Sequence, residues 1–108
     1  MRITFTGHAG LWVETDDVKI LCDPWVSKNK AFFETWSVYP DNNNLDWDEI
    51  ILNTDVLFLS HVHEDHFDEE FLNRLYLQNK KVKVLIPDFR FCVLKDKLKN
   101  IGFENFIT

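Results

Sequence analysis

A short run of metal-binding side chains directly after an apolar stretch constrains this chain most strongly. The run is His61-Val62-His63-Glu64-Asp65-His66, and it follows the stretch 56–60, which is apolar up to Ser60. Divalent ions such as zinc bind imidazole nitrogens and carboxylate oxygens at about 2.0–2.2 Å. Three histidines within six positions, in a chain that contains four, are difficult to explain by packing alone. The run therefore predicts a metal site at the end of a buried strand.

The spacing of these side chains divides them between two ions. If the extended backbone continues past the strand, His61 and His63 point to the same side and can bind one ion. Asp65 and His66 follow after the chain turns, so we expect them to reach a second ion about 3.5–4 Å away. Glu64 is out of phase with the two leading histidines, and we expect it to face solvent.

The run also resembles the signature of a known family. His-x-His-x-Asp-His after a hydrophobic strand is the motif of the metallo-β-lactamase fold hydrolases, and it stands here as His61, His63, Asp65 and His66. The resemblance implies a zinc site of two ions, with Mn²⁺ or Fe²⁺ as alternatives, and a catalytic role for Asp65 as a ligand of the second ion. The family's third histidine and bridging carboxylate lie on later loops, whereas the remaining histidine here, His8, precedes the motif.

Other segments are similar to one branch of this family. Cys22-Asp23-Pro24-Trp25-Val26, Ala31-Phe32 and Trp36 resemble the metallo-β-lactamase-like part of CMP-N-acetylneuraminate hydroxylases, and Gly7-His8-Ala9 resembles the ascorbate-phosphate lactonase branch. The resemblance implies an α+β fold of the αββα sandwich type. It also implies a small-molecule substrate with an ester, lactone or phosphodiester bond, such as a sugar or sugar-nucleotide.

The chain is short for such a sandwich. Its 108 residues allow one domain at most, residues 1–108, and we expect this domain to be incomplete. We therefore expect the N-terminal half of the fold, a mixed sheet with helices on one face. The other sheet face would then be apolar and uncovered, so we expect a homo-oligomer or a missing C-terminal half to cover it.

Composition excludes some partners and favours a cytoplasmic protein. The net charge of −6 argues against a nucleic-acid partner, because Lys and Arg supply most of the affinity for phosphates. No apolar stretch approaches the ~20 residues of a membrane span. Cys22 and Cys92 are too few and too far apart for a disulfide framework, which favours a reducing compartment.

Hydrophobic periodicity predicts an alternation of strands and helices. The expected strands are Arg2–Thr6, Leu11–Thr15, Val18–Cys22, Val56–Ser60, Val82–Ile86 and Phe103–Ile107, of which the first three form a meander. Near-continuous apolarity suggests that Val82–Ile86 is covered on both faces. The expected helices are Asp46–Leu52, with Trp47 in the core, a helix from an Asp68 cap to Leu77, and one from Asp88 that Gly102 ends.

The irregular segment from Pro24 to Leu45 is rich in aromatic residues. Its rings could form a wall beside the metals, with Trp25 and Trp36 contacting substrate, or they could simply roof the exposed sheet face.

Two further residues have alternative roles. Asp23 ends a strand expected beside Val56–Ser60, so its carboxylate would hydrogen-bond a ligand imidazole; the alternative is an Asp-Pro turn opener. His8 could contact substrate or cap a strand end.

Two functions remain open. The chain is either the metal-bearing part of a hydrolase that activates water, or a non-catalytic metal-binding fragment or module whose site is incomplete.

Overall fold

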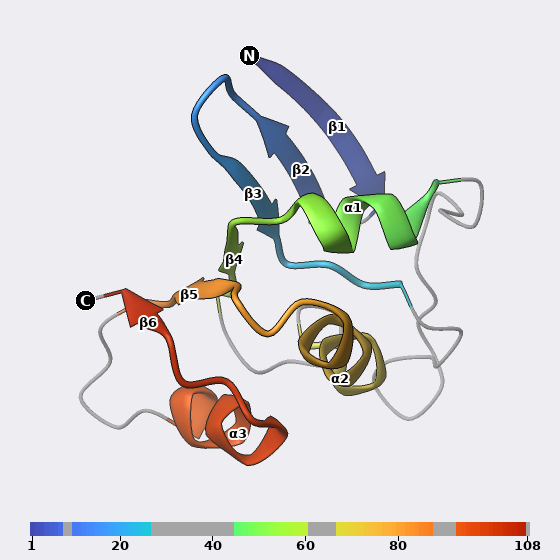
Figure 1. Cartoon of the computed structure of the whole chain (residues 1–108). Helices are drawn as coiled ribbons and strands as arrows, with labels where there is room; N and C mark the ends of the chain where they lie inside the picture. Colours follow the sequence, from blue (N-terminus) through green and yellow to red (C-terminus); the bar gives the residue numbers. More distant parts are fainter. Residues whose placement is uncertain (8–9, 27–44, 61–66, 88–92, 108) are drawn as a thin grey trace.

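The protein forms a mixed sheet with helices packed against it (Figure 1). The computed structural model describes residues 1–7, 10–26, 45–60, 67–87 and 93–107. Within these ranges the strands are β1 (Arg2–Gly7), β2 (Gly10–Glu14), β3 (Lys19–Cys22), β4 (Val56–Phe58), β5 (Lys83–Leu85) and β6 (Phe106–Ile107). The helices are α1 (Trp47–Asn53), α2 (Glu69–Gln78) and α3 (Val93–Ile101).

The strands follow one another in sequence order across the sheet. Strands β1, β2 and β3 form an antiparallel meander, as the sequence predicts. From β3 onward each strand is parallel to the next, and helices α2 and α3 supply the crossovers between β4, β5 and β6. None of the helices in the described ranges is long and apolar enough to cross a membrane.

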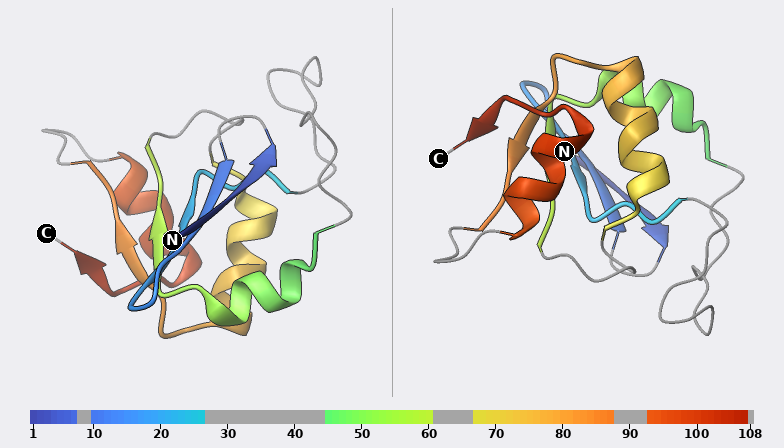
Figure 2. Two further views of the ribbon diagram at one scale, coloured as in Figure 1. Left: turned by 90° about the horizontal axis from the view of Figure 1, so that it is seen from above. Right: turned by 90° about the horizontal axis from the view of Figure 1, so that it is seen from below.

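One face of the sheet carries the core. A row of residues in register crosses all six strands on this face: Thr4, Trp12, Leu21, Leu57, Val84 and Phe106. The three helices lie on this side of the sheet (Figure 2). They bury Leu21, Leu57 and Val84 completely, at 0% exposure. Burial of a Leu or Val side chain stabilises a fold by about 1.5–3 kcal/mol, so this row anchors the domain.

The opposite face is apolar and open. A second row in register consists of Phe5, Leu11, Cys22, Phe58, Leu85 and Ile107. Phe5 is 54% exposed, and its neighbour Ile3 on the same face is 57% exposed. The expected mixed sheet with helices on one face is therefore confirmed.

The strand expected at Val82–Ile86 is shorter and differently buried. In β5, Val84 is fully buried, but Leu85 on the other face is 37% exposed. The prediction that both faces are covered is wrong, because among the described residues only the helix side of this strand is packed.

Aspartates cap the first two helices, as predicted for Asp68, while the expected start of the last helix at Asp88 lies outside the described residues. Asp46 caps α1 by accepting a hydrogen bond from the backbone N–H of Glu49 at 3.2 Å, and the α2 cap is Asp68. Trp47 lies in the core, 6% exposed, with its ring edge-on to Phe71.

The end of α3 sets the position of the last strand. Gly102 has φ of +133°, and the N–H groups of Gly102 and Phe103 both donate to the carbonyl of Leu98. Phe103 then packs edge-on against Tyr76 in the core. The strand expected from Phe103 therefore begins only at Phe106.

Gly102→Ala should lower the free energy of unfolding by about 1–3 kcal/mol, because a side chain is strained at this φ. An added Cβ would also lie 2.5 Å from the Tyr76 ring. Urea denaturation measures the loss, with Lys99→Ala on the exposed surface of α3 as the control. Equal stability of the two variants would contradict this account of the turn.

Candidate metal centre

The metal-binding run follows β4 at the edge of the sheet where β3 and β4 both end. These strands are parallel, so Cys22 and Phe58 lie side by side at their carboxyl ends. Residues His61 to His66, His8 and Trp36 lie outside the described residues. The structure therefore shows the frame around the predicted site: Ser60 before the run, Phe67 and Asp68 after it, and, at the edge where β4 ends, the end of β1, the start of β2 and the end of β3.

Asp23 holds the residue that immediately precedes the run. Its carboxylate accepts two hydrogen bonds from Ser60, one from the backbone N–H and one from the hydroxyl, each at 2.8 Å. Asp23 is buried, 6% exposed, and its own N–H donates to the carbonyl of Phe58 at 2.9 Å.

The backbone of Asp23 is in the left-handed region, with φ of +40°. Asp tolerates this conformation better than most residues, because its short polar side chain bonds locally. Asp23 thus directly follows β3 and is also the residue at which the chain turns. The predicted bond from Asp23 to a ligand imidazole concerns side chains outside the described ranges, while its contacts with Ser60 give it a positioning role.

Asp68 holds the other side of the run and was predicted only as a helix cap. One carboxylate oxygen accepts a hydrogen bond from the N–H of Phe71 at 3.1 Å, which is the capping bond of α2. The other accepts a hydrogen bond from the N–H of Val26 at 2.8 Å. This second contact joins residues far apart in the sequence, and no local pattern signals it.

Trp25 lies inside the protein. Its side chain is 2% exposed and is among the largest buried side chains. Trp25 therefore packs within the protein as described, and its predicted contact with substrate stays a prediction.

Gly10, the first residue of β2, lies against Asp23. A Cβ added at Gly10 would clash with the Thr6 hydroxyl and lie 3.3 Å from the Asp23 carbonyl. Gly10 therefore allows a close backbone approach at this edge of the sheet. The start of β2 therefore lies at the same end of the sheet as the end of β4, which precedes Ser60.

Cys22 behaves as an apolar residue at this edge. Burial raises the pKa of its thiol above the ordinary value, and the negative charge of Asp23 raises it further. Because the thiolate is the metal-binding form, this environment disfavours Cys22 as a ligand. Among the residues that the structure describes, no group of three or more His, Cys, Asp or Glu side chains could hold a metal.

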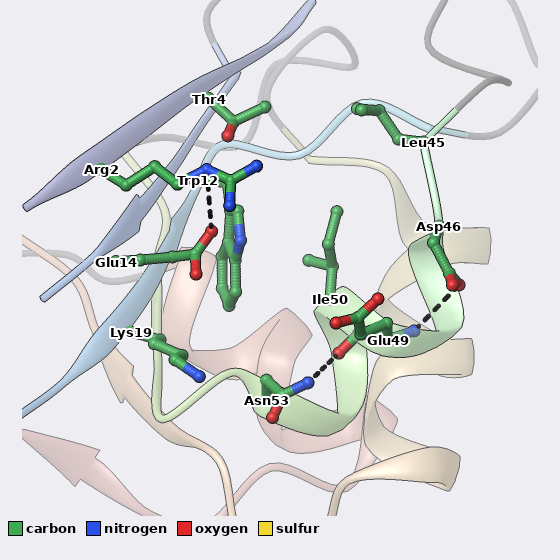
Figure 3. Close-up of a pocket in the computed structure, with 10 residues that line it drawn as sticks. All are labelled: Arg2, Thr4, Trp12, Glu14, Lys19, Leu45, Asp46, Glu49, Ile50 and Asn53. Carbon is green, nitrogen blue, oxygen red and sulfur yellow. Dashed lines mark hydrogen bonds and ion pairs between the residues drawn. The ribbon is translucent and has the colours of Figure 1, made fainter. Parts of the chain in front are cut away.

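A pocket of about 190 Å³ opens at the other end of the sheet (Figure 3). It lies between α1 and the strands β1 and β2, and Arg2, Glu14 and Lys19, which line it, are in register with one another. Those residues are at the opposite ends of the strands from Gly7, Leu11 and Cys22. The pocket is therefore separate from the predicted metal centre.

The family match covers nearly the whole chain. Residues 2–104 match the family described as the beta-lactamase superfamily domain. The chain belongs to this superfamily. The resemblance seen in the motif is thus confirmed, and the α+β fold is that of the metallo-β-lactamases.

Curated relatives are much longer proteins. The chain is 46% identical over 106 residues to a protein of Mycolicibacterium smegmatis described as a candidate Rieske 2Fe-2S iron-sulfur protein, covering 98% of the chain and 20% of that relative. It is 26% identical over 112 residues to the cytidine monophosphate-N-acetylneuraminic acid hydroxylase of Asterias rubens, covering 98% of the chain and 17% of the relative. A UPF0173 metal-dependent hydrolase of Salinibacter ruber is 36% identical over 69 residues, which are 64% of the chain and 25% of that protein. The chain thus spans about a fifth of the length of these relatives.

Solved structures with the same fold include metal-dependent hydrolases. A possible metal-dependent hydrolase from Veillonella parvula has a TM-score of 0.69 at 19% identity, covering 91% of the chain and 38% of that structure. An isothiocyanate hydrolase from Delia radicum gut bacteria has a TM-score of 0.66 at 21% identity, covering 100% of the chain and 41% of that structure. At these identities the comparison establishes the fold alone.

Asp23→Asn should lower the free energy of unfolding by about 1–3 kcal/mol, because its amide group leaves one donor of Ser60 without an acceptor. Asn also tolerates positive φ, so the backbone turn is retained. Ser60→Ala removes only the hydroxyl bond and should cost about 0.5–1.5 kcal/mol. Chemical denaturation of both variants compares them; a larger loss for Ser60→Ala would contradict the role given to the carboxylate.

Proposed function

We propose that this chain is the metal-bearing part of a hydrolase that uses His61, His63, Asp65 and His66 to bind two zinc-type ions. The observation that carries the proposal is the frame around these residues. Buried carboxylates hold the chain before and after the run. Asp23 accepts a hydrogen bond from Ser60, which precedes the run, and Asp68, which follows it, accepts one from Val26. A site that orients metal ligands needs such rigid support.

The donor set suits a divalent transition metal. Three imidazoles and one carboxylate are ligands that zinc accepts, and Mn²⁺ or Fe²⁺ can share them. Such an ion acts as a Lewis acid and brings the pKa of a bound water molecule close to neutrality. The chain's own contribution is to hold His61 and His63 for one ion and Asp65 and His66 for the other, with Asp65 as the catalytic residue of the second position.

The substrate that we propose is a small molecule with an ester, lactone or phosphodiester bond. The relation to a cytidine monophosphate-N-acetylneuraminic acid hydroxylase supports a sugar or sugar-nucleotide, while the relation to a metal-dependent hydrolase supports the hydrolytic chemistry. His8 and Trp36 are our candidates for contact with this substrate. We further propose a cytoplasmic location, which suits a chain with a free Cys22.

A second candidate function is a metal-binding module without turnover. It is favoured by the relation to a much longer protein described as an iron-sulfur protein, of which the chain matches a fifth. In such a protein this domain could support chemistry performed elsewhere. Turnover separates the two functions, since both predict bound metal.

His61→Ala combined with His63→Ala should reduce the metal content of the purified protein to a small fraction of the parent value, because both ligands of one ion are removed. His8→Ala is the matched control and should retain the metal. Elemental analysis after dialysis gives the metal content, and circular dichroism verifies the fold. Equal metal in the parent protein and the double variant would overturn the proposed site.

Asp65→Ala should abolish most hydrolysis of a phosphodiester or lactone in a protein that carries the complete superfamily domain. Glu64→Ala should change the rate little, because its side chain is out of phase with the ligands. Steady-state kinetics of the two variants compare them. The reverse order would make Glu64 a catalytic base at a site with one metal.

We also propose that residues 1–108 form the N-terminal half of the αββα sandwich, with the apolar row from Phe5 to Ile107 as the surface that the other half, or a second copy, covers. Two sheets that pack face to face bury such rows between them. Phe5 and Ile3, each more than half exposed, are the most accessible members of this face.

Sedimentation equilibrium of the chain by itself should therefore show association, and replacing Ile3 and Phe5 with Lys should shift it toward monomer. Leu77→Lys is the control, because Leu77 is 72% exposed on α2, away from the open face. A parent chain that is strictly monomeric, without binding of an apolar dye, would contradict the docking surface.

A further inference from the structure

The segment 23–26 contacts the chain on both sides of the metal-binding run. It leaves β3 at Asp23, passes through Pro24 and Trp25, and reaches Val26 beside the start of α2, as the cyan segment of Figure 2 shows. The carboxylate of Asp23 accepts a hydrogen bond from the N–H of Ser60, the last residue before the run. The N–H of Val26 donates a hydrogen bond to the carboxylate of Asp68, the second residue after the run. The two flanks of the run are therefore joined through one short turn.

This turn is firmly held. Trp25 is 2% exposed and Pro24 is fully buried, so packing restricts both side chains. The proline ring also fixes its own φ. The N–H of Asp23 is bonded to β4. The separation between the two flanks of the run is consequently set by a rigid segment.

The chemistry of Asp68 exceeds what a helix cap requires. Capping needs one oxygen, and Ser, Thr or Asn would provide it. A carboxylate that is 5% exposed is costly to bury unless its oxygens are hydrogen-bonded. Its second oxygen accepts the bond from Val26, a residue with no part in α2. The geometry thus accounts for an aspartate at this position through the link to segment 23–26.

We propose that Asp68 is a positioning residue for the metal-binding run, and that it acts through Val26 to fix the flank of the run after His66. The inference rests on the proposed metal site at residues 61–66. Metal binding is sensitive to such support, because partners that orient the ligands typically contribute about 10–100-fold in affinity. The two carboxylates have separate tasks: Asp23 fixes the beginning of the run, and Asp68 fixes its end.

Asp68→Asn tests the link. An asparagine can cap α2 with its oxygen, but its amide group cannot at the same time accept the bond from Val26. Asp68→Ser keeps the cap and is too short for the link, which gives a second variant if the first does not fold. Asp46→Asn is the matched control, because Asp46 caps α1 and is exposed.

We expect both Asp68 variants to bind zinc about 10–100-fold more weakly in competition with a chelator. The absorption spectrum of the cobalt-substituted protein should change as well, because it reports ligand geometry. Asp46→Asn should preserve both. A loss of stability alone, measured by denaturation, would not move the cobalt spectrum of the folded protein.

Two outcomes would overturn the inference in different ways. Folded Asp68 variants with parental zinc affinity and cobalt spectrum would show that Asp68 is only a cap, and the proposed metal site would stand. A parent protein that binds neither zinc nor cobalt would refute the metal site, and the positioning role with it.

Discussion

The parallel pairing of β3 with β4 is the constraint on which the rest of the structure depends. It joins the antiparallel meander to the parallel part of the sheet and brings Cys22 beside Phe58. Because both strands end at one edge, Asp23 can reach Ser60. Without this pairing, the turn after β3 and the metal-binding run after β4 would have no fixed relation.

The elements of the fold follow from local patterns in the sequence. Alternating apolar residues predicted the meander, and the cap at Asp68 predicted the start of α2. Gly102 ended α3 as expected, because a residue at positive φ is needed there. The fold family followed from the spacing of His61, His63, Asp65 and His66.

The sequence was less informative where burial and long-range contacts decide the outcome. The near-continuous apolar stretch of β5 suggested two covered faces, but periodicity cannot distinguish a covered apolar face from an open one. The burial of Trp25 could not be predicted from its residue type, since an indole ring suits both a core and a binding surface. The bond from Val26 to Asp68 spans 42 positions, and no local rule contains it.

The different burial of the two sheet faces has a consequence for the order of folding. The helix-side row from Thr4 to Phe106 is covered by helices of the same chain, so its collapse requires no other segment. The open row from Phe5 to Ile107 stays exposed until another part of the protein, or a second copy, covers it. During that interval it is an apolar, strand-rich surface of the kind that drives aggregation of folding intermediates. Assembly of a complete protein is therefore most vulnerable at this face, at some distance from the chemistry of the metal ligands.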